Sequence, residues 1–234
     1  MGSEVIKKFI VEHEDILQNS ILTCADLIML KDKFYCNYMK KPRITEALIL
    51  RWLHHRLGMN PNVYINEVTN NGIILRSEKK YEAGIGRQTL DISILSNLEL
   101  IMGISIKVST STSAYLDGAD FFNPILERYS SYYVKSMEDY QYRRIHKKRI
   151  GVPTLLQDMA RIENIQQAQK KRFNSLTIVF AKKKQKDEFW ITEFEKDFNH
   201  KYLFLADTPD LPLREAFEVS FPSQIKKRVF SEFI

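Results

Sequence analysis

The chain has 234 residues, of which 44% are hydrophobic and 27% charged, as in a globular protein with a sizeable core. No apolar run approaches the roughly 20 residues of a membrane-spanning helix, and the first residues lack the layout of a secretory signal. Two cysteines are too few for a disulfide framework or a zinc ribbon, so we expect a soluble, cytoplasmic protein with reduced thiols.

The net charge of +6 is concentrated in a few short segments, chiefly 143–149, 170–172, 182–186 and 226–228. Basic segments are most often solvated surface, but basic residues close to several tyrosines also suit the phosphates of a nucleic acid. The residues that we expect to contact nucleic acid are Arg143, Arg144, Lys147, Lys148, Arg149, Lys182, Lys183 and Lys184.

No repeat, low-complexity tract or linker divides the chain, which indicates a single domain over residues 1–234. Within it we expect a helical N-terminal segment (1–43), a core (44–194) and a C-terminal extension (195–234). Apolar spacing predicts helices over 3–40 and over 44–57, the second ending before Gly58. The Asn71-Gly72 pair predicts a hairpin joining strands at 63–68 and 73–75.

Residues 89–95 and 99–109 are predicted to form two further strands, joined by a turn at Ser96, Asn97 and Leu98. The rest of the chain predicts helices over 118–141 and 155–172, strands over 175–181 and 189–194, a hairpin over 182–186 and a short helix after Pro212. The pattern as a whole predicts an α/β protein with a central mixed sheet flanked by helices.

Asp91, Ser105 and Lys107 are predicted to meet on one face of the sheet. A turn near Asn97 places Asp91 opposite Gly103 or Ser105, and Lys107 follows Ser105 on the same face. A lysine within an apolar strand needs a charged partner, and Asp91 is the natural one. A structural ion pair is one interpretation, and a site that binds a divalent cation and a phosphodiester is the other.

Other acids could complete such a site. Glu46 lies at the start of the second predicted helix, where it either favours the helix dipole or contributes a metal ligand. Asp117 and Asp120 follow the lysine strand and could each cap a helix or bind metal. Glu127 lies about two helical turns beyond Asp120 and is a further candidate.

The order of a helix Glu, a strand Asp and then a tripeptide ending in Lys resembles the PD-(D/E)XK nuclease superfamily over roughly residues 44–130. The tripeptide here is Ser105-Ile106-Lys107, which is similar to a variant found in some type II restriction endonucleases. In that variant the acid has moved to a following helix, and Asp120 has the corresponding offset from Lys107. Leu90 departs from the motif, which commonly has proline there, and the displaced acid is ordinarily Glu.

The resemblance implies a restriction-endonuclease-like fold and a magnesium-dependent endonuclease that cuts double-stranded DNA at a specific site. It implies that Asp91, Asp120 and Glu46 bind Mg²⁺ and that Lys107 orients the attacking water beside Ser105. A palindromic site would require a homodimer, and a methyltransferase acting on the same site is a possible partner.

Two alternatives remain open from the sequence. One keeps the fold and changes the substrate to a DNA junction, a repair intermediate or DNA of any sequence. The other is a non-catalytic nucleic-acid-binding protein with a degenerate nuclease fold, and the missing tripeptide acid favours it.

Overall fold

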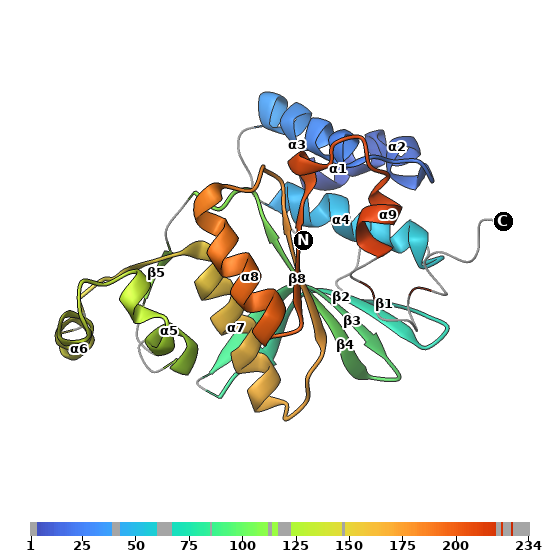
Figure 1. The fold of residues 1–234 in the computed structure, drawn as a ribbon. Helices are drawn as coiled ribbons and strands as arrows, with labels where there is room; N and C mark the ends of the chain where they lie inside the picture. Colours follow the sequence, from blue (N-terminus) through green and yellow to red (C-terminus); the bar gives the residue numbers. More distant parts are fainter. Residues whose placement is uncertain are drawn as a thin grey trace.

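The computed structural model describes residues 4–38, 43–59, 67–84, 86–111, 114–116, 123–146 and 148–218, together with Phe221 and Lys226. Among these residues a six-stranded mixed sheet has the order β1-β2-β3-β4-β7-β8 (Figure 1). The strands are β1 (Glu67–Asn70), β2 (Ile73–Glu82), β3 (Arg87–Ser96), β4 (Glu99–Lys107), β7 (Asn174–Val179) and β8 (His200–Phe204).

The first four strands form an antiparallel meander, whereas β7 runs parallel to β4 and β8 runs parallel to β7. A parallel pair needs a crossover connection, and helix α7 (Thr154–Ala168) supplies it between β4 and β7. The chain is therefore an α/β protein with a mixed sheet, as the sequence predicts.

Helices cover both faces of the sheet (Figure 1). One face carries α1 (Glu4–Glu12), α2 (Glu14–Gln18), α3 (Cys24–Tyr38), α4 (Arg43–Arg56) and α9 (Leu213–Glu218). The other face carries α7 and α8 (Glu188–Asp197). Among the described helices, none is both long and apolar enough to cross a membrane.

The segment between β4 and α7 forms an arm that projects from this body, with α6 at its tip (Figure 1). Its two short strands pair with each other and not with the main sheet. The elements of the segment are β5 (Ala114–Tyr115), α5 (Pro124–Arg128), the 3-10 turn η2 (Ser130–Tyr132), α6 (Met137–Ile145) and β6 (Gly151–Val152). The continuous helix predicted over 118–141 is therefore divided where the structure describes it.

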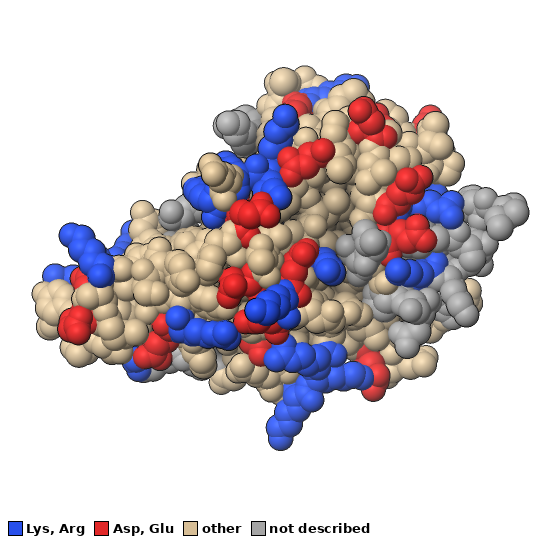
Figure 2. Space-filling view, in the orientation of Figure 1, with Lys and Arg blue, Asp and Glu red and all other residues tan. Residues whose placement is uncertain are grey.

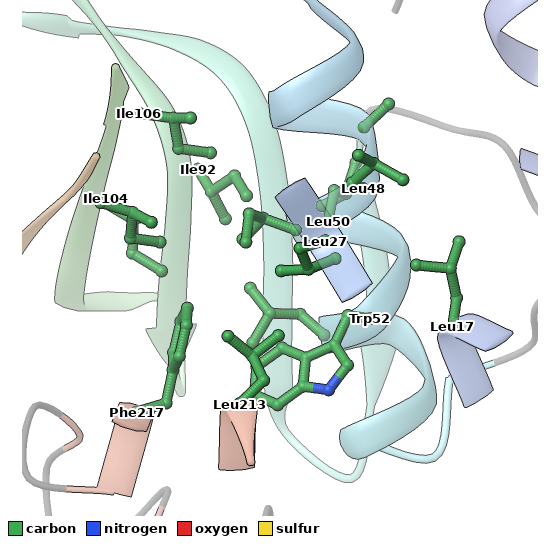
Figure 3. Close-up of a cluster of buried hydrophobic side chains, with 14 of the residues drawn as sticks. Leu17, Leu27, Leu48, Leu50, Trp52, Ile92, Ile104, Ile106, Leu213 and Phe217 are labelled. Atoms are coloured by element: carbon green, nitrogen blue, oxygen red, sulfur yellow. The ribbon is translucent and has the colours of Figure 1, made fainter. Parts of the chain in front are cut away.

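The larger core joins both ends of the described chain to the sheet (Figure 3). Trp52 of α4 packs against Phe217 of α9, with ring centroids 4.7 Å apart. Ile92 of β3 and Ile104 of β4 complete this layer from the sheet. Burial of large apolar side chains contributes about 1.5–3 kcal/mol each, which fixes α4 against the two central strands.

Two turns set the positions of the central strands. Asn71 and Gly72 have φ values of 47° and 76°, and Asn97 and Leu98 have φ values of 49° and 67°. Positive φ at both central residues is characteristic of the tight hairpin turn that matches the twist of its strands. Both predicted turns are therefore present. Residues 63–66 of the strand predicted over 63–68 lie outside the described residues, and the described strand β1 continues to Asn70.

Two predictions for the region after β7 are wrong. Residues 189–194 belong to helix α8, because Trp190 and Phe194, four residues apart, share the face that packs into the second core. The Lys182–Lys186 segment is no hairpin and leads into the 3-10 turn η3 (Gln185–Asp187) before α8.

Candidate active site

The hairpin of β3 and β4 brings Asp91 and Ser105 together. Ile92 pairs with Ile104, so the next residues along, Asp91 and Ser105, lie opposite each other. The Ser105 hydroxyl is 3.3 Å from Asp91 Oδ2, and the Ile106 amide donates to the same oxygen at 2.7 Å. The Asp91 carboxylate is thus held between the two strands where regular pairing ends.

Lys107 has a different partner from the one that the sequence suggests. Its ammonium lies 3.0 Å from Asp158 Oδ1, whereas Asp91 forms its ion pair with Arg161 at 3.8 Å. The reason is that α7 packs across this face of the sheet and inserts Asp158, whose side chain is only 3% exposed. A nearby buried carboxylate satisfies the lysine more closely than the one on the adjacent strand.

Asp158 is surrounded by donors on both of its oxygens. Oδ1 accepts from Ser105 at 2.8 Å and from Arg161 at 2.6 Å, in addition to the ion pair with Lys107. Oδ2 accepts from the Thr177 hydroxyl at 2.8 Å. Burial alone would raise the pKa of this carboxyl, but the charges of Lys107 and Arg161 reverse the effect and hold the pKa below its usual range.

A buried hydrogen-bond chain supports Asp158 from the parallel strands. Thr177 Oγ1 lies 2.9 Å from His200 Nε2, and His200 Nδ1 lies 2.7 Å from Ser175 Oγ. Burial lowers the pKa of His200 to about 4, so the ring is neutral at physiological pH. Because Thr177 donates its only hydroxyl proton to Asp158, Nε2 must donate to Thr177 and Nδ1 must accept from Ser175.

Glu46 approaches the site from the opposite layer, on the first turn of α4. Burial, together with the negative charges of Asp91 and Glu78, raises the pKa of this carboxyl to about 7. The charges of Arg43 and Lys107 act in the opposite direction and only partly compensate. The influence of Asp91 on Glu46 shows that the two carboxylates predicted to bind metal are electrostatic neighbours.

Glu78 is a third acid near this pair, and its backbone is unusual. It follows Ser77, which pairs with Ile92, and so lies beside Asp91 in the register of β2 and β3. Its φ of 51° is in the left-handed region, which is rare for a residue inside a strand. Its side chain forms an ion pair with Arg43 at 3.1 Å. The local distortion thus directs an additional carboxylate toward α4.

Of the acids predicted after the lysine strand, Glu127 is the one that the described residues include, and it does not join this cluster. Asp117 and Asp120 lie outside the described residues. Glu127 lies on α5, where its charge acts on the Tyr133 hydroxyl. Within the described part of the chain, no hydrogen bond or ion pair connects Glu127 to Asp91 or Lys107. Among the residues that the structure describes, Asp158 is the acid that forms an ion pair with Lys107.

The residues present suit a magnesium ion that keeps much of its hydration. Among the described residues no set of three or more His, Cys, Asp or Glu side chains is arranged as a complete metal site. Mg²⁺, however, is commonly bound by one or two carboxylates, with water and phosphate as the other ligands. Glu46 and Asp91 fit this requirement because a divalent cation would relieve their mutual repulsion. Asp158 does not, because its side chain is buried and its charge is already balanced by Lys107 at 3.0 Å and Arg161 at 2.6 Å.

A polar pocket of 310 Å³ opens beside the two cations of the site. Lys107 and Arg161 contribute to its lining, together with Asp158, the apolar residues Leu126 and Ala160, and six neutral polar side chains. These polar side chains are Gln88, Thr89, Asn123, Thr154, Gln157 and Asn164. The two cations outnumber the one acid of the lining, Asp158, and together with the neutral amide donors they suit an anionic, hydrogen-bonding ligand.

The basic residues predicted to contact nucleic acid fall into two places. Arg143, Arg144, Lys148 and Arg149 lie on and after α6 at the tip of the arm, and Lys147 lies outside the described residues. Lys182, Lys183 and Lys184 lie between β7 and η3. Several are paired locally, such as Arg143 with Asp139 at 2.9 Å and Lys183 with Glu188 at 2.7 Å. Figure 2 shows basic and acidic side chains interspersed on the face of the molecule that it presents.

Asp158 and Arg161 are the site residues that sequence reasoning missed. Asp158 lies among apolar residues of α7 that are buried, with Leu155 three positions before it and Ile162 four positions after it. An acid on the apolar stripe of a helix requires a partner, and that signal was available in the sequence. The identity of the partner depends on packing between segments about 50 residues apart.

Comparisons of the chain with models of protein families, with curated proteins and with solved structures found no match.

Proposed function

We propose that the protein is a magnesium-dependent nuclease that hydrolyses phosphodiester bonds of DNA. The observation that carries the proposal is the clustering of Asp91, Ser105 and Lys107 around the Asp158–Arg161 pair. Glu46 lies within electrostatic range of Asp91 and Lys107, and its pKa of about 7 reflects burial and neighbouring acids. Carboxylates that repel one another beside a lysine and an arginine are the parts needed to hold a cation and an anionic phosphate together.

The roles of the residues follow from their positions. Glu46 and Asp91 would hold the magnesium ion, which supplies Lewis-acid stabilisation and a water of lowered pKa. Lys107 and Arg161 line the polar pocket, where they would bind the phosphodiester and stabilise the negative charge that develops on it. Asp158 would keep both cations in place through its contacts with them.

The fold is compatible with the proposal and also with the finer one that the sequence resemblance suggests. A central mixed sheet flanked by helices is what a restriction-endonuclease-like protein would have. That resemblance suggests three further proposals, namely sequence-specific cutting of double-stranded DNA, a homodimer and a cognate methyltransferase. The arm tipped by α6 and the Lys182–Lys184 segment would contact the DNA backbone.

One observation favours a non-catalytic alternative. Ser105 stands where the motif has an acid, and Lys107 already has a close carboxylate partner in Asp158. A lysine whose charge is neutralised in this way would have a structural role only. In that case the protein would bind nucleic acid through the arm without cutting it.

Incubation of the protein with plasmid DNA and magnesium separates these possibilities. Discrete fragments indicate a sequence-specific endonuclease, a smear indicates a nuclease without sequence choice, and intact plasmid contradicts the proposal. Lys107→Ala and Asp91→Ala should each slow cleavage by about a hundredfold or more, since each removes charge stabilisation at the reacting phosphate. Cleavage at the wild-type rate by either variant would show that the site is assigned wrongly.

A further inference from the structure

A second pocket, with an aromatic lining and a volume of 560 Å³, lies where the arm meets α8. Four aromatic side chains contribute to it, namely Tyr132, Tyr133, Phe189 and Trp190. The volume is within the range of about 300–1,000 Å³ that is usual for pockets that bind small molecules.

One aromatic side chain of the pocket is largely exposed to solvent. Tyr132 is 57% exposed, and its ring centroid lies 4.4 Å from that of Phe189. Phe189 in turn lies 4.9 Å from Trp190, whose ring is almost perpendicular at 78°. An exposed ring in such a row offers a flat apolar face to a planar ligand.

The aromatic pocket adjoins the polar pocket of the candidate active site. Thr154 lines both pockets. Thr110, three residues after Lys107, also lines the aromatic pocket, and its hydroxyl donates to Asp187 at 2.5 Å. The loop that follows the lysine strand is therefore fixed to the base of α8. A ligand with an anionic group at Lys107 could place its next moiety against the aromatic rings.

The charge at the pocket indicates what such a ligand would be. Lys186 contributes to the lining beside the aromatic rings and is exposed to solvent. A cation next to a cluster of aromatic rings is the combination that binds single-stranded nucleic acid, where the rings stack on bases and the cation pairs with phosphate. Asp187 does not oppose this, because it is buried and bonded to Thr110.

We propose that the aromatic pocket holds a nucleobase of the substrate, adjacent to the phosphate bound at Lys107. This inference rests on the proposed nuclease function. A base within a duplex stack cannot enter such a pocket, so the nucleotide next to the cut must be unpaired or extruded. Extrusion from an intact duplex costs the free energy of unpairing and unstacking, and the substrate class favoured by the pocket is therefore DNA with an unpaired nucleotide at the cut.

Trp190 provides a direct reporter of binding. The chain has two tryptophans, and the other one, Trp52, is buried in the core on the opposite face of the sheet. A base that stacks in the pocket should change the emission of Trp190 and leave that of Trp52 unchanged. The probes are two DNA duplexes of one sequence, of which one carries a single unpaired nucleotide, titrated without divalent cation so that no cutting occurs.

The wild-type protein should bind the duplex with the unpaired nucleotide more tightly, by roughly 5- to 150-fold, which is the range expected for stacking of one base. Tyr132→Ala should remove most of this preference, and its exposed position makes a loss of folding unexpected. Phe189→Leu, which keeps an apolar side chain, should reduce the preference in the same direction. Tyr142→Ala, at an exposed aromatic residue of the arm, should change the affinity for both duplexes in the same proportion.

Equal affinity of the wild-type protein for the two duplexes would overturn the inference, as would a preference that survives Tyr132→Ala. The outcome for the nuclease proposal is read separately, from cutting of the same duplexes with magnesium. A preference without cutting would support the nucleobase pocket and contradict hydrolysis. Cutting without a preference would support hydrolysis and contradict the pocket.

Discussion

The candidate site has two halves that differ in how their charges are balanced. In one half, Asp158 is neutralised by Lys107 and Arg161 and receives hydrogen bonds from Ser105 and Thr177. In the other half, burial and the negative charges of Asp91 and Glu78 raise the pKa of Glu46 to about 7. The charges of the first, complete half are balanced by the protein alone, and we propose that a cation would balance those of the second, incomplete half.

The two pKa shifts have opposite directions and indicate different roles for the two carboxyl groups. The pKa of Asp158 is lowered because the fold supplies its counter-charges, which is the sign of a structural element. The pKa of Glu46 is raised chiefly by burial and further by the incompletely compensated charges of Asp91 and Glu78, which is more typical of a binding site. The complete half positions the lysine, and the incomplete half is where we expect chemistry.

The largest effect is expected from removing the charge at the complete half. Asp158→Asn leaves Lys107 and Arg161 without their shared buried counter-ion and should lower the free energy of unfolding by about 3 kcal/mol. Urea unfolding followed by circular dichroism measures this. The matched control is Asp139→Asn, which breaks the more exposed pair with Arg143 and should cost at most about 1 kcal/mol. Similar losses for the two variants would show that the Asp158 cluster has no special structural role.

A smaller loss is expected from the hydrogen-bond chain behind Asp158. Thr177→Val keeps the shape of the side chain but leaves Asp158 Oδ2 without a donor and His200 Nε2 without an acceptor. The free energy of unfolding should fall by about 2 kcal/mol, because unpaired buried polar groups lose their solvation without compensation. Thr177→Ser, which retains the hydroxyl, should recover most of the loss. Equal stability of the valine variant and the wild type would exclude a supporting role for the chain.

The smallest effect on stability is expected from the incomplete half, and it depends on pH. An unfolded Glu has a pKa of about 4.3, and Glu46 has a pKa of about 7 in the folded protein. The proton on Glu46 therefore stabilises the fold fully below about pH 4.3, and this stabilisation is lost as the pH rises through 7. Glu46 is partly exposed, so the loss between pH 5 and pH 8 should be roughly 1 kcal/mol.

Glu46→Gln removes this titration and provides the comparison. The stability of the wild type relative to this variant should fall between pH 5 and pH 8. Glu67→Gln is the control, because the hydrogen bond from Arg76 lowers the pKa of Glu67 and its titration is complete below this range. A wild-type stability that follows the glutamine variant at every pH would show that Glu46 has an ordinary environment.

The geometry of the central hairpin was predictable from the sequence because it depends on local information. The turn at Asn97 and Leu98 sets the register, and strict alternation then places Asp91 opposite Ser105 on one face. Gly58 likewise ends α4 with a positive φ of 60°, as its position after the predicted helix suggests. Features fixed within about 15 residues of each other were accessible to reasoning from periodicity and turns.

Features that depend on packing between distant segments could not be predicted from the sequence. Lys107 pairs with Asp158, about 50 residues away, because α7 crosses the same face of the sheet, and no pattern in the sequence specifies that crossing. Phe189, Trp190 and Ile191 favour a strand by their intrinsic preference, but tertiary contacts of Trp190 and Phe194 impose a helix instead. In both cases the burial of one face decided between alternatives that were locally plausible.

Magnesium binding at the incomplete half tests the account most directly. Calorimetric titration at pH 8, where Glu46 is largely ionised, should show a site in the wild type that Asp91→Asn abolishes and Thr177→Val retains. This result would place the ion at Asp91, in the half that contains Glu46, and leave the Asp158 cluster as the structural half. Absence of magnesium binding by the wild type, or equal binding by Asp91→Asn, would contradict the account.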